Sequence, residues 1–179
     1  MPAAAHPVTV ADFSQLAEDH GPAYHELRQG EIVPVTRPKW KHFLAQRNIR
    51  RLLDSLAEPG SIADTELAFR PLPDYELRVA DVAWVSAARI HNVDPEGYFD
   101  GVPELVVEIL SPSNSTADLQ ERKQLCLGNG CLEFWTVDTD LRNLTVTTPD
   151  GQTVSYAASA HIPLSLFGNA IVPVREITG

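Results

Sequence analysis

A carboxylate lies inside the most apolar stretch of the sequence. Residues 104–110 read Glu-Leu-Val-Val-Glu-Ile-Leu, a composition typical of a buried β-strand, and Glu108 interrupts it. An ionised carboxylate without a partner costs several kcal/mol to bury. Glu108 must therefore be compensated by an arginine or lysine, by a proton or by a metal ion. Which of these it is decides what chemistry the chain can perform.

A second acid opens another apolar segment, Asp81-Val-Ala-Trp-Val85. Side chains alternate along a strand, so Glu108 projects from one face of a central strand. If the two strands are neighbours, Asp81 and Glu108 can share Mg²⁺ or Mn²⁺, hard cations that take oxygen ligands. Such an ion polarises a phosphoryl oxygen and lowers the pKa of an attacking water. The alternative is that Glu108 pairs with a buried arginine and Asp81 caps a turn.

A cation on the following helix could complete this site. Ser115-Thr-Ala-Asp118 is a capping-box pattern and predicts a helix that runs to about Gly128. At about 100° per residue, Lys123 falls roughly 40° from the apolar Leu119 and is expected to point inward, toward Glu108. There it would orient water or stabilise a pentacovalent phosphate. The alternative is a lysine whose stem covers the core while its ammonium group reaches solvent.

The elements that must position these residues are strands with a few helices on them. Glu26 lies on the first strand of an N-terminal hairpin and either joins the acidic cluster or faces solvent. The pattern predicts an α+β or mixed α/β fold in a single domain, residues 1–179. Helices are predicted at about 9–20, 40–56 and 115–128, strands at about 24–28, 31–35, 62–70, 76–85, 104–110, 132–137, 144–148 and 154–156, and a loop at about 87–101.

Composition limits the classes of function. The 179 residues carry 44% hydrophobic residues and a formal net charge of −10, which is typical of a globular protein and weighs against non-specific nucleic-acid binding. Charge can be segregated, however: Arg37–Arg51 contains six basic residues and no acid, either a solvated helix face or a surface for phosphates. No apolar run suits a membrane span and no secretory signal is visible, so we expect a cytoplasmic protein that does not bind membranes. Cys126 and Cys131 are expected to fill the core.

Several motifs occur together and in a fixed order. They are Tyr24-His-Glu-Leu-Arg-Gln-Gly-Glu-Ile, His42 on the first long helix, Ala80-Asp-Val-Ala-Trp-Val, Leu105-Val-Val-Glu-Ile-Leu-Ser-Pro-Ser, Asp118, Gly130 and Glu133-Phe-Trp-Thr-Val-Asp138. Together they resemble the PD-(D/E)xK nuclease superfamily, and within it the Uma family of restriction endonucleases. The resemblance covers most of the chain and implies a restriction-endonuclease-like core, with a mixed central sheet flanked by helices.

The resemblance also implies an activity and roles for residues. It implies Mg²⁺-dependent hydrolysis of DNA phosphodiester bonds, with Asp81 and Glu108 as the metal ligands. Glu26 would be an accessory acid and His42 an accessory residue. Leu110 occupies the position of the superfamily's E-x-K lysine, and the family supplies a lysine from the next helix instead.

An ungapped count places Arg122 at that helical lysine, with Lys123 adjacent. Either Lys123 swings in, or Arg122 serves electrostatically, or activity is impaired, because arginine and lysine are not interchangeable. The second hypothesis is therefore a catalytically silent, nuclease-derived interaction or structural protein. Such a protein is expected to be a homodimer.

Overall fold

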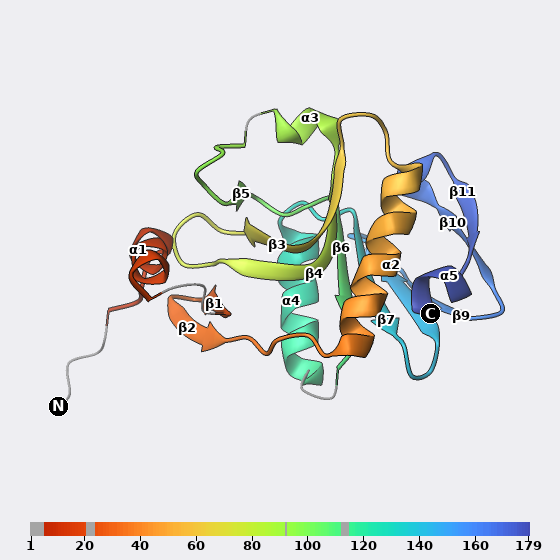
Figure 1. The fold of residues 1–179 in the computed structure, drawn as a ribbon, viewed down its shortest axis with the longest axis horizontal. Coiled ribbons are helices and arrows are strands. Elements are labelled where there is room, and N and C mark those ends of the chain that lie inside the picture. The colour runs from red at the N-terminus through yellow and green to blue at the C-terminus, as the bar shows by residue number, and fades with distance from the viewer. Residues whose placement is uncertain (1–5, 21–23, 92, 112–114) are drawn as a thin grey trace.

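The structure, a computed structural model, describes residues 6–20, 24–91, 93–111 and 115–179. Within them, seven strands form one mixed sheet in the order β5-β3-β4-β6-β7-β8-β9 (Figure 1). The sheet strands are β3 (Ile62–Arg70), β4 (Arg78–Val85), β5 (Phe99–Asp100), β6 (Leu105–Ile109), β7 (Glu133–Asp138), β8 (Asn143–Thr147) and β9 (Thr153–Ala157). The helices are α1 (Val10–His20), α2 (Trp40–Leu56), α3 (Ala87–Ile90), α4 (Thr116–Gly128) and α5 (Arg175–Thr178).

The centre of the sheet joins an antiparallel pair to a parallel pair. β4 runs antiparallel to β6, with Val82 opposite Val107, and β6 runs parallel to β7, with Val107 opposite Trp135. A parallel pair needs a crossover connection, which α4 supplies between β6 and β7. The β8–β9 hairpin turns at Asp150-Gly151, a residue pair that favours hairpin turns.

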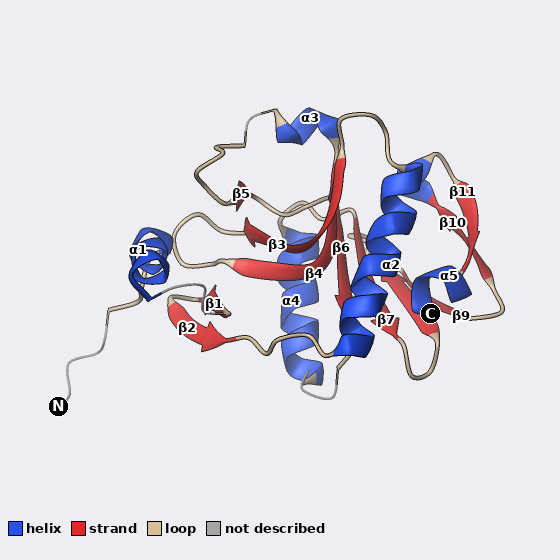
Figure 2. Ribbon diagram, viewed as in Figure 1, coloured by secondary structure: helices blue, strands red, loops and turns tan. Residues whose placement is uncertain are grey.

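Two helices cover opposite faces of this sheet (Figure 2). The α2 residues Ala45, Ile49 and Leu53 pack on the face that carries Leu105, Val107 and Ile109. On the other face, Cys126 of α4 packs with Val106 and Phe134. Both cysteines are buried free thiols, as predicted. The alternation expected along residues 104–110 is confirmed, and Glu108 shares the α4 face with Val106.

The N-terminal segment adds a hairpin beside β4. The strands β1 (His25–Arg28) and β2 (Glu31–Pro34) pair around Gln29-Gly30, as predicted. Leu27 bridges to Leu77 through reciprocal backbone hydrogen bonds of 2.9 Å, which fixes β1 against the segment leading into β4. The hairpin therefore delivers the side chain of its neighbour Glu26 to the sheet.

Two parts of the sequence fold into more than was predicted. The stretch at 87–101, expected to be a loop, contains α3 and the short β5, which pairs parallel with β3. The C-terminal part forms β10 (His161–Leu164) and β11 (Ala170–Pro173), an antiparallel pair separated by the 3₁₀ turn η1 (Ser165–Phe167), before α5. Among the described residues, no helix is both long and apolar enough to cross a bilayer.

Candidate active site

Asp81 lies where β4 and β6 part. Their pairing ends at Val82–Val107, and beyond it the Asp81 Oδ2 atom accepts the Ile109 N–H at 2.7 Å. The carboxylate thus replaces a backbone carbonyl of β4 as the partner of this donor. The other oxygen, Oδ1, lies 2.8 Å from Nε2 of His42 and 3.3 Å from Nε2 of Gln46, both on α2. Asp81 is held by three contacts and remains partly exposed.

The strand β4 changes face at Asp81. Ala80 packs in the core on the α4 side, whereas Val82 packs in the core on the α2 side. Residues two apart normally share a face, so the strand is twisted at the residue between them. The Asp81 carboxylate bonds the N–H of Ile109, the residue that follows Glu108, and its charge acts on Glu108. The structure therefore brings together the two acids that the sequence proposed as a pair, at the break in β4.

Glu66 is an acid of this site that the sequence reasoning missed. It lies on β3 in the register position opposite Asp81, and its φ of 56° is left-handed. Its carboxylate accepts a hydrogen bond from Nε2 of Gln46. Burial and the charges of Asp81 and Glu26 raise the pKa of Glu66 above its ordinary value, against the Gln46 hydrogen bond and His42. Glu66 lies two residues after Asp64 on a predicted strand, so the sequence pattern predicts that both acids face solvent.

Glu26 is fully buried and is already paired. Nη2 of Arg122 donates to both of its carboxylate oxygens at 2.7 Å, and Nε of Arg28 donates at 2.9 Å. The Val79 N–H donates a further bond at 2.9 Å. Burial works to raise the pKa of Glu26, but Arg122, the Val79 N–H and Arg28 outweigh it and hold the pKa below its usual value. Glu26 therefore joins the acidic cluster, as an ionised and saturated carboxylate.

Glu108 is much less well compensated. Its contact with Arg122 is a single one, from Nη1 at 3.3 Å, and the same nitrogen donates to the Val79 carbonyl at 2.8 Å. Burial raises the pKa of Glu108 to about 8, and the charges of Asp81, Glu26 and Glu66 act in the same direction, against Arg122. A proton or a cation is therefore favoured at this carboxylate.

Arg122, and not Lys123, is the cation that reaches the carboxylates. Arg122 is buried, with its pKa raised by Glu108 and Glu26 against the effect of burial, whereas Lys123 is partly exposed. The ion pairs within the described parts of the chain include Arg122 and do not include Lys123. Lys123 was expected to point inward, but it is Arg122 that reaches the carboxylates. Arg122 and Cys126 are four residues apart and define the buried line of α4.

His42 faces Asp81, although nothing but the resemblance pointed to it. It is half-buried, and burial works to lower its pKa. The hydrogen bond to Asp81 and the charges of Asp81 and Glu66 prevail, so the pKa of His42 is raised and its charged form is favoured. His42 therefore orients Asp81 and partly neutralises it from the α2 side.

The chain was compared with known proteins. The model of the Uma2 family, described as "Putative restriction endonuclease", matches residues 10–172. No curated protein matches the chain. A crystal structure described as "a putative nuclease belonging to DUF820", from Anabaena variabilis ATCC 29413, has a TM-score of 0.80 at 22% sequence identity. The match covers 96% of this chain and 98% of that one, which confirms the predicted fold of a mixed sheet flanked by helices. Because the family model spans most of its length, the chain belongs to the Uma2 family of "putative restriction endonucleases".

Proposed function

We propose that this protein is a metal-dependent endonuclease that hydrolyses DNA phosphodiester bonds at the break in β4. The observation that carries the proposal is the clustering of acidic side chains there. The acids that influence one another are Glu26, Glu66, Asp81 and Glu108. Arg122 bonds mainly to Glu26, to which it donates at 2.7 Å. Glu108 has the longer contact with Arg122, at 3.3 Å, and is less well neutralised by it.

The donor set fits a hard divalent ion. Asp81 and Glu108 would hold Mg²⁺ or Mn²⁺, because Mg²⁺ usually takes one or two carboxylates and completes its shell with waters and substrate phosphates. Among the described residues, no group of three or more His, Cys, Asp or Glu side chains is placed to hold a metal ion. When bound, the ion would polarise the phosphoryl oxygen and acidify the attacking water. Glu66 is the acid nearest in register to Asp81 that could act beside it.

The other side chains of the site have supporting roles. His42 and Gln46 hold Oδ1 of Asp81 from α2, so that its orientation does not depend on the substrate. Arg122 keeps Glu26 ionised and presents Nη1 toward Glu108, where a fixed positive charge would stabilise the negative charge that develops on a phosphate. Lys123, one residue further along α4, would contact the phosphates of the substrate backbone.

Cleavage of supercoiled plasmid in Mg²⁺ or Mn²⁺ tests this function. Asp81→Asn and Glu108→Gln are each expected to reduce cleavage by at least about 100-fold, as removal of a catalytic electrostatic interaction does. Glu104→Gln is the matched control, because it removes a buried carboxylate that bonds instead to Ser86 and Arg89. Equal cleavage by wild-type protein and both site variants would reject the proposal.

The second candidate is a catalytically silent protein of this family that acts as an interaction or structural subunit, as a homodimer. One observation favours it: Arg122 already contacts two carboxylates of the site as a permanent counter-ion. Calorimetric titration with Mn²⁺ separates the candidates. Binding that disappears in Glu108→Gln supports the nuclease, whereas no binding at millimolar metal supports the silent protein.

A further inference from the structure

The outer face of α2 carries aromatic rings and arginines in one line. Trp40, Phe43, Arg47 and Arg51 recur at intervals of three or four residues and are all exposed; we call them the α2 stripe. Trp40 is 72% exposed and Phe43 43% exposed, and their rings stack with centroids 5.5 Å apart at an interplanar angle of 28°. Exposing this much aromatic surface is unfavourable unless a partner covers it.

The cations of the stripe are available to such a partner. Arg50, on the neighbouring line of the helix, pairs with Asp54 and Asp64. Arg47 and Arg51, in contrast, form no ion pair within the described parts of the chain. No acid occurs between Arg37 and Arg51, although the net charge of the chain is −10. The stripe therefore combines rings and unpaired guanidinium groups on an otherwise acidic protein, which complements a polyanion with flat apolar groups.

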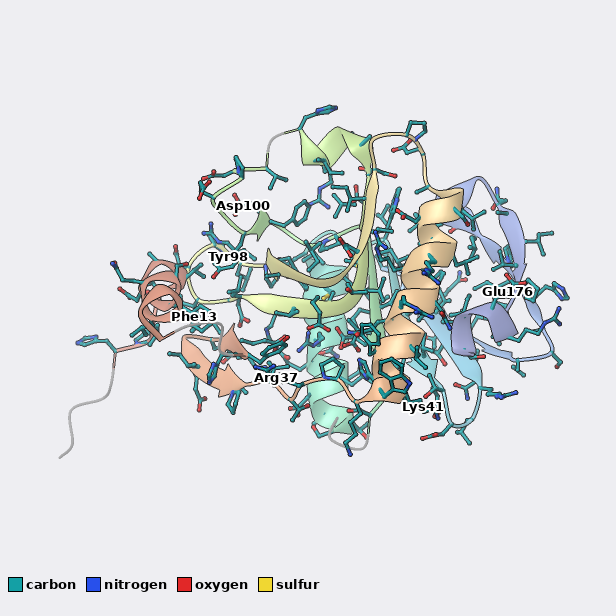
Figure 3. All side chains as sticks on the ribbon, in the orientation of Figure 1. Phe13, Arg37, Lys41, Tyr98, Asp100 and Glu176 are labelled. Atoms are coloured by element: carbon teal, nitrogen blue, oxygen red, sulfur yellow. The ribbon has the colours of Figure 1, made fainter. Side chains whose placement is uncertain are left out.

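The stripe begins in the turn of α2 that also carries a residue of the candidate active site. Trp40 is the first residue of α2, and His42, which bonds Asp81, lies in the same turn. At 1.5 Å per residue, the stripe extends about 16 Å from Trp40 to Arg51. Figure 3 labels Arg37 and Lys41 at the end of the molecule where α2 starts, and Arg37 itself lies over the ring of Tyr24 at 4.6 Å. At about 100° per residue, His42 lies on the far side of the helix from the stripe, so a strand bound along the stripe would pass around the start of α2 to reach the acids.

We propose that the α2 stripe binds an unpaired nucleic-acid strand, with a base stacked on Trp40 and phosphates held by Arg47 and Arg51. A base exposes its flat face to a protein ring only when it is unstacked, so the exposed rings select single-stranded or locally opened DNA over intact duplex. This inference rests on the proposed function and defines its substrate more narrowly. DNA that carries a gap, flap or bubble places an unpaired strand next to the bond that is cut.

Tryptophan fluorescence in metal-free buffer with EDTA tests the stripe separately from cleavage. The other two tryptophans, Trp84 and Trp135, are buried, so quenching on addition of oligothymidylate reports on Trp40. Binding of the labelled oligonucleotide, alone and annealed to its complement, is then measured by anisotropy. Trp40→Leu keeps an apolar side chain but removes the ring, and is expected to weaken single-strand binding about 5- to 100-fold. Trp40→Phe is expected to lose less.

Two further variants sharpen the test. Ile171→Ala, at a residue 71% exposed on β11, is the control for loss of exposed apolar surface and should bind as the wild type does. The double variant Arg47→Gln with Arg51→Gln should make the affinity less dependent on salt. The negative slope of log affinity against log salt should become shallower by about 0.7 for each phosphate that the protein no longer neutralises.

The inference is overturned if Trp40→Leu binds as tightly as wild type, or if duplex binds as well as the single strand. It is also overturned if wild-type protein sediments as a dimer that Trp40→Leu converts to monomer, because a second copy then covers the stripe. Quenching of Trp40 without any metal-dependent cleavage of nicked, gapped or supercoiled DNA would instead reject the nuclease and retain the stripe as a binding surface.

Discussion

Replacing Arg122 with glutamine should destabilise the protein far more than loss of an ordinary surface arginine. The change removes the guanidinium that donates to both oxygens of Glu26 at 2.7 Å, and Glu26 is 0% exposed. Breaking a buried ion pair by removing one partner costs about 3–5 kcal/mol, because the remaining charge is left unpaired. Arg28 and the Val79 N–H still bond Glu26, so we expect a value near the lower end, about 3 kcal/mol.

Urea unfolding followed by far-UV circular dichroism at neutral pH measures this loss. Arg50→Gln is the control, because Arg50 pairs with the exposed Asp54 and Asp64 and should contribute less than about 1 kcal/mol. The double variant Glu26→Gln with Arg122→Gln should recover part of the loss, since Glu26 is then no longer a buried carboxylate that lacks Arg122. The reasoning is refuted if Arg122→Gln costs no more than Arg50→Gln, or if the double variant shows no coupling.

Three further predictions concern single groups. The pKa of Glu108 is raised to about 8, so in metal-free buffer its stabilising contribution is complete below pH 4.5 and is lost as pH rises toward 8. The thermal unfolding temperature of Glu108→Gln should therefore depend less on pH than that of the wild type. At the alkaline end of the range the variant should be the more stable of the two. Gly30→Ala should cost more than about 1 kcal/mol in urea unfolding, because Gly30 has φ +78° and an added Cβ would lie 2.4 Å from Cβ of Pro7. Burial raises the pKa of both Cys126 and Cys131, so neither thiol should react with Ellman's reagent until urea unfolds the protein, and rapid labelling of the native state would contradict the described core.

Much of the fold could be predicted from hydrophobic patterns within single segments of the sequence. The long apolar period of residues 40–56 gives α2 with the predicted bounds, and the alternation through 104–110 gives β6 with Glu108 on the expected face. The pairing of Asp81 with Glu108 was also accessible, because two apolar strands with one acid each are natural neighbours in a central sheet. The strands β5, β10 and β11, of two to four residues, were not predicted. The equally short β1 and β2 were predicted because they flank the Gln29-Gly30 turn.

The cation of the site could not be assigned by counting along α4. Leu119, Cys126 and Leu127 suggest an apolar line that favours Lys123, but the buried residues of α4 are Arg122 and Cys126. A buried arginine needs its partner to be present, and that partner, Glu26, is 96 residues away on a hairpin. Glu66 was hidden for a related reason: its left-handed backbone accompanies the twist of β4 at Asp81, which is a property of two strands together.

The hairpin that carries Glu26 lies at the margin of the sheet in Figure 1, but it supplies a residue of the candidate active site. A substitution at either Glu26 or Arg122 leaves the other charge buried without its main partner. For the same reason, a shortened version that began after the hairpin would lose two strands and leave Arg122 without Glu26. Trimming for crystallisation or for fusion to another protein should stop ahead of Val8, whose N–H bonds the Gly30 carbonyl at 2.9 Å.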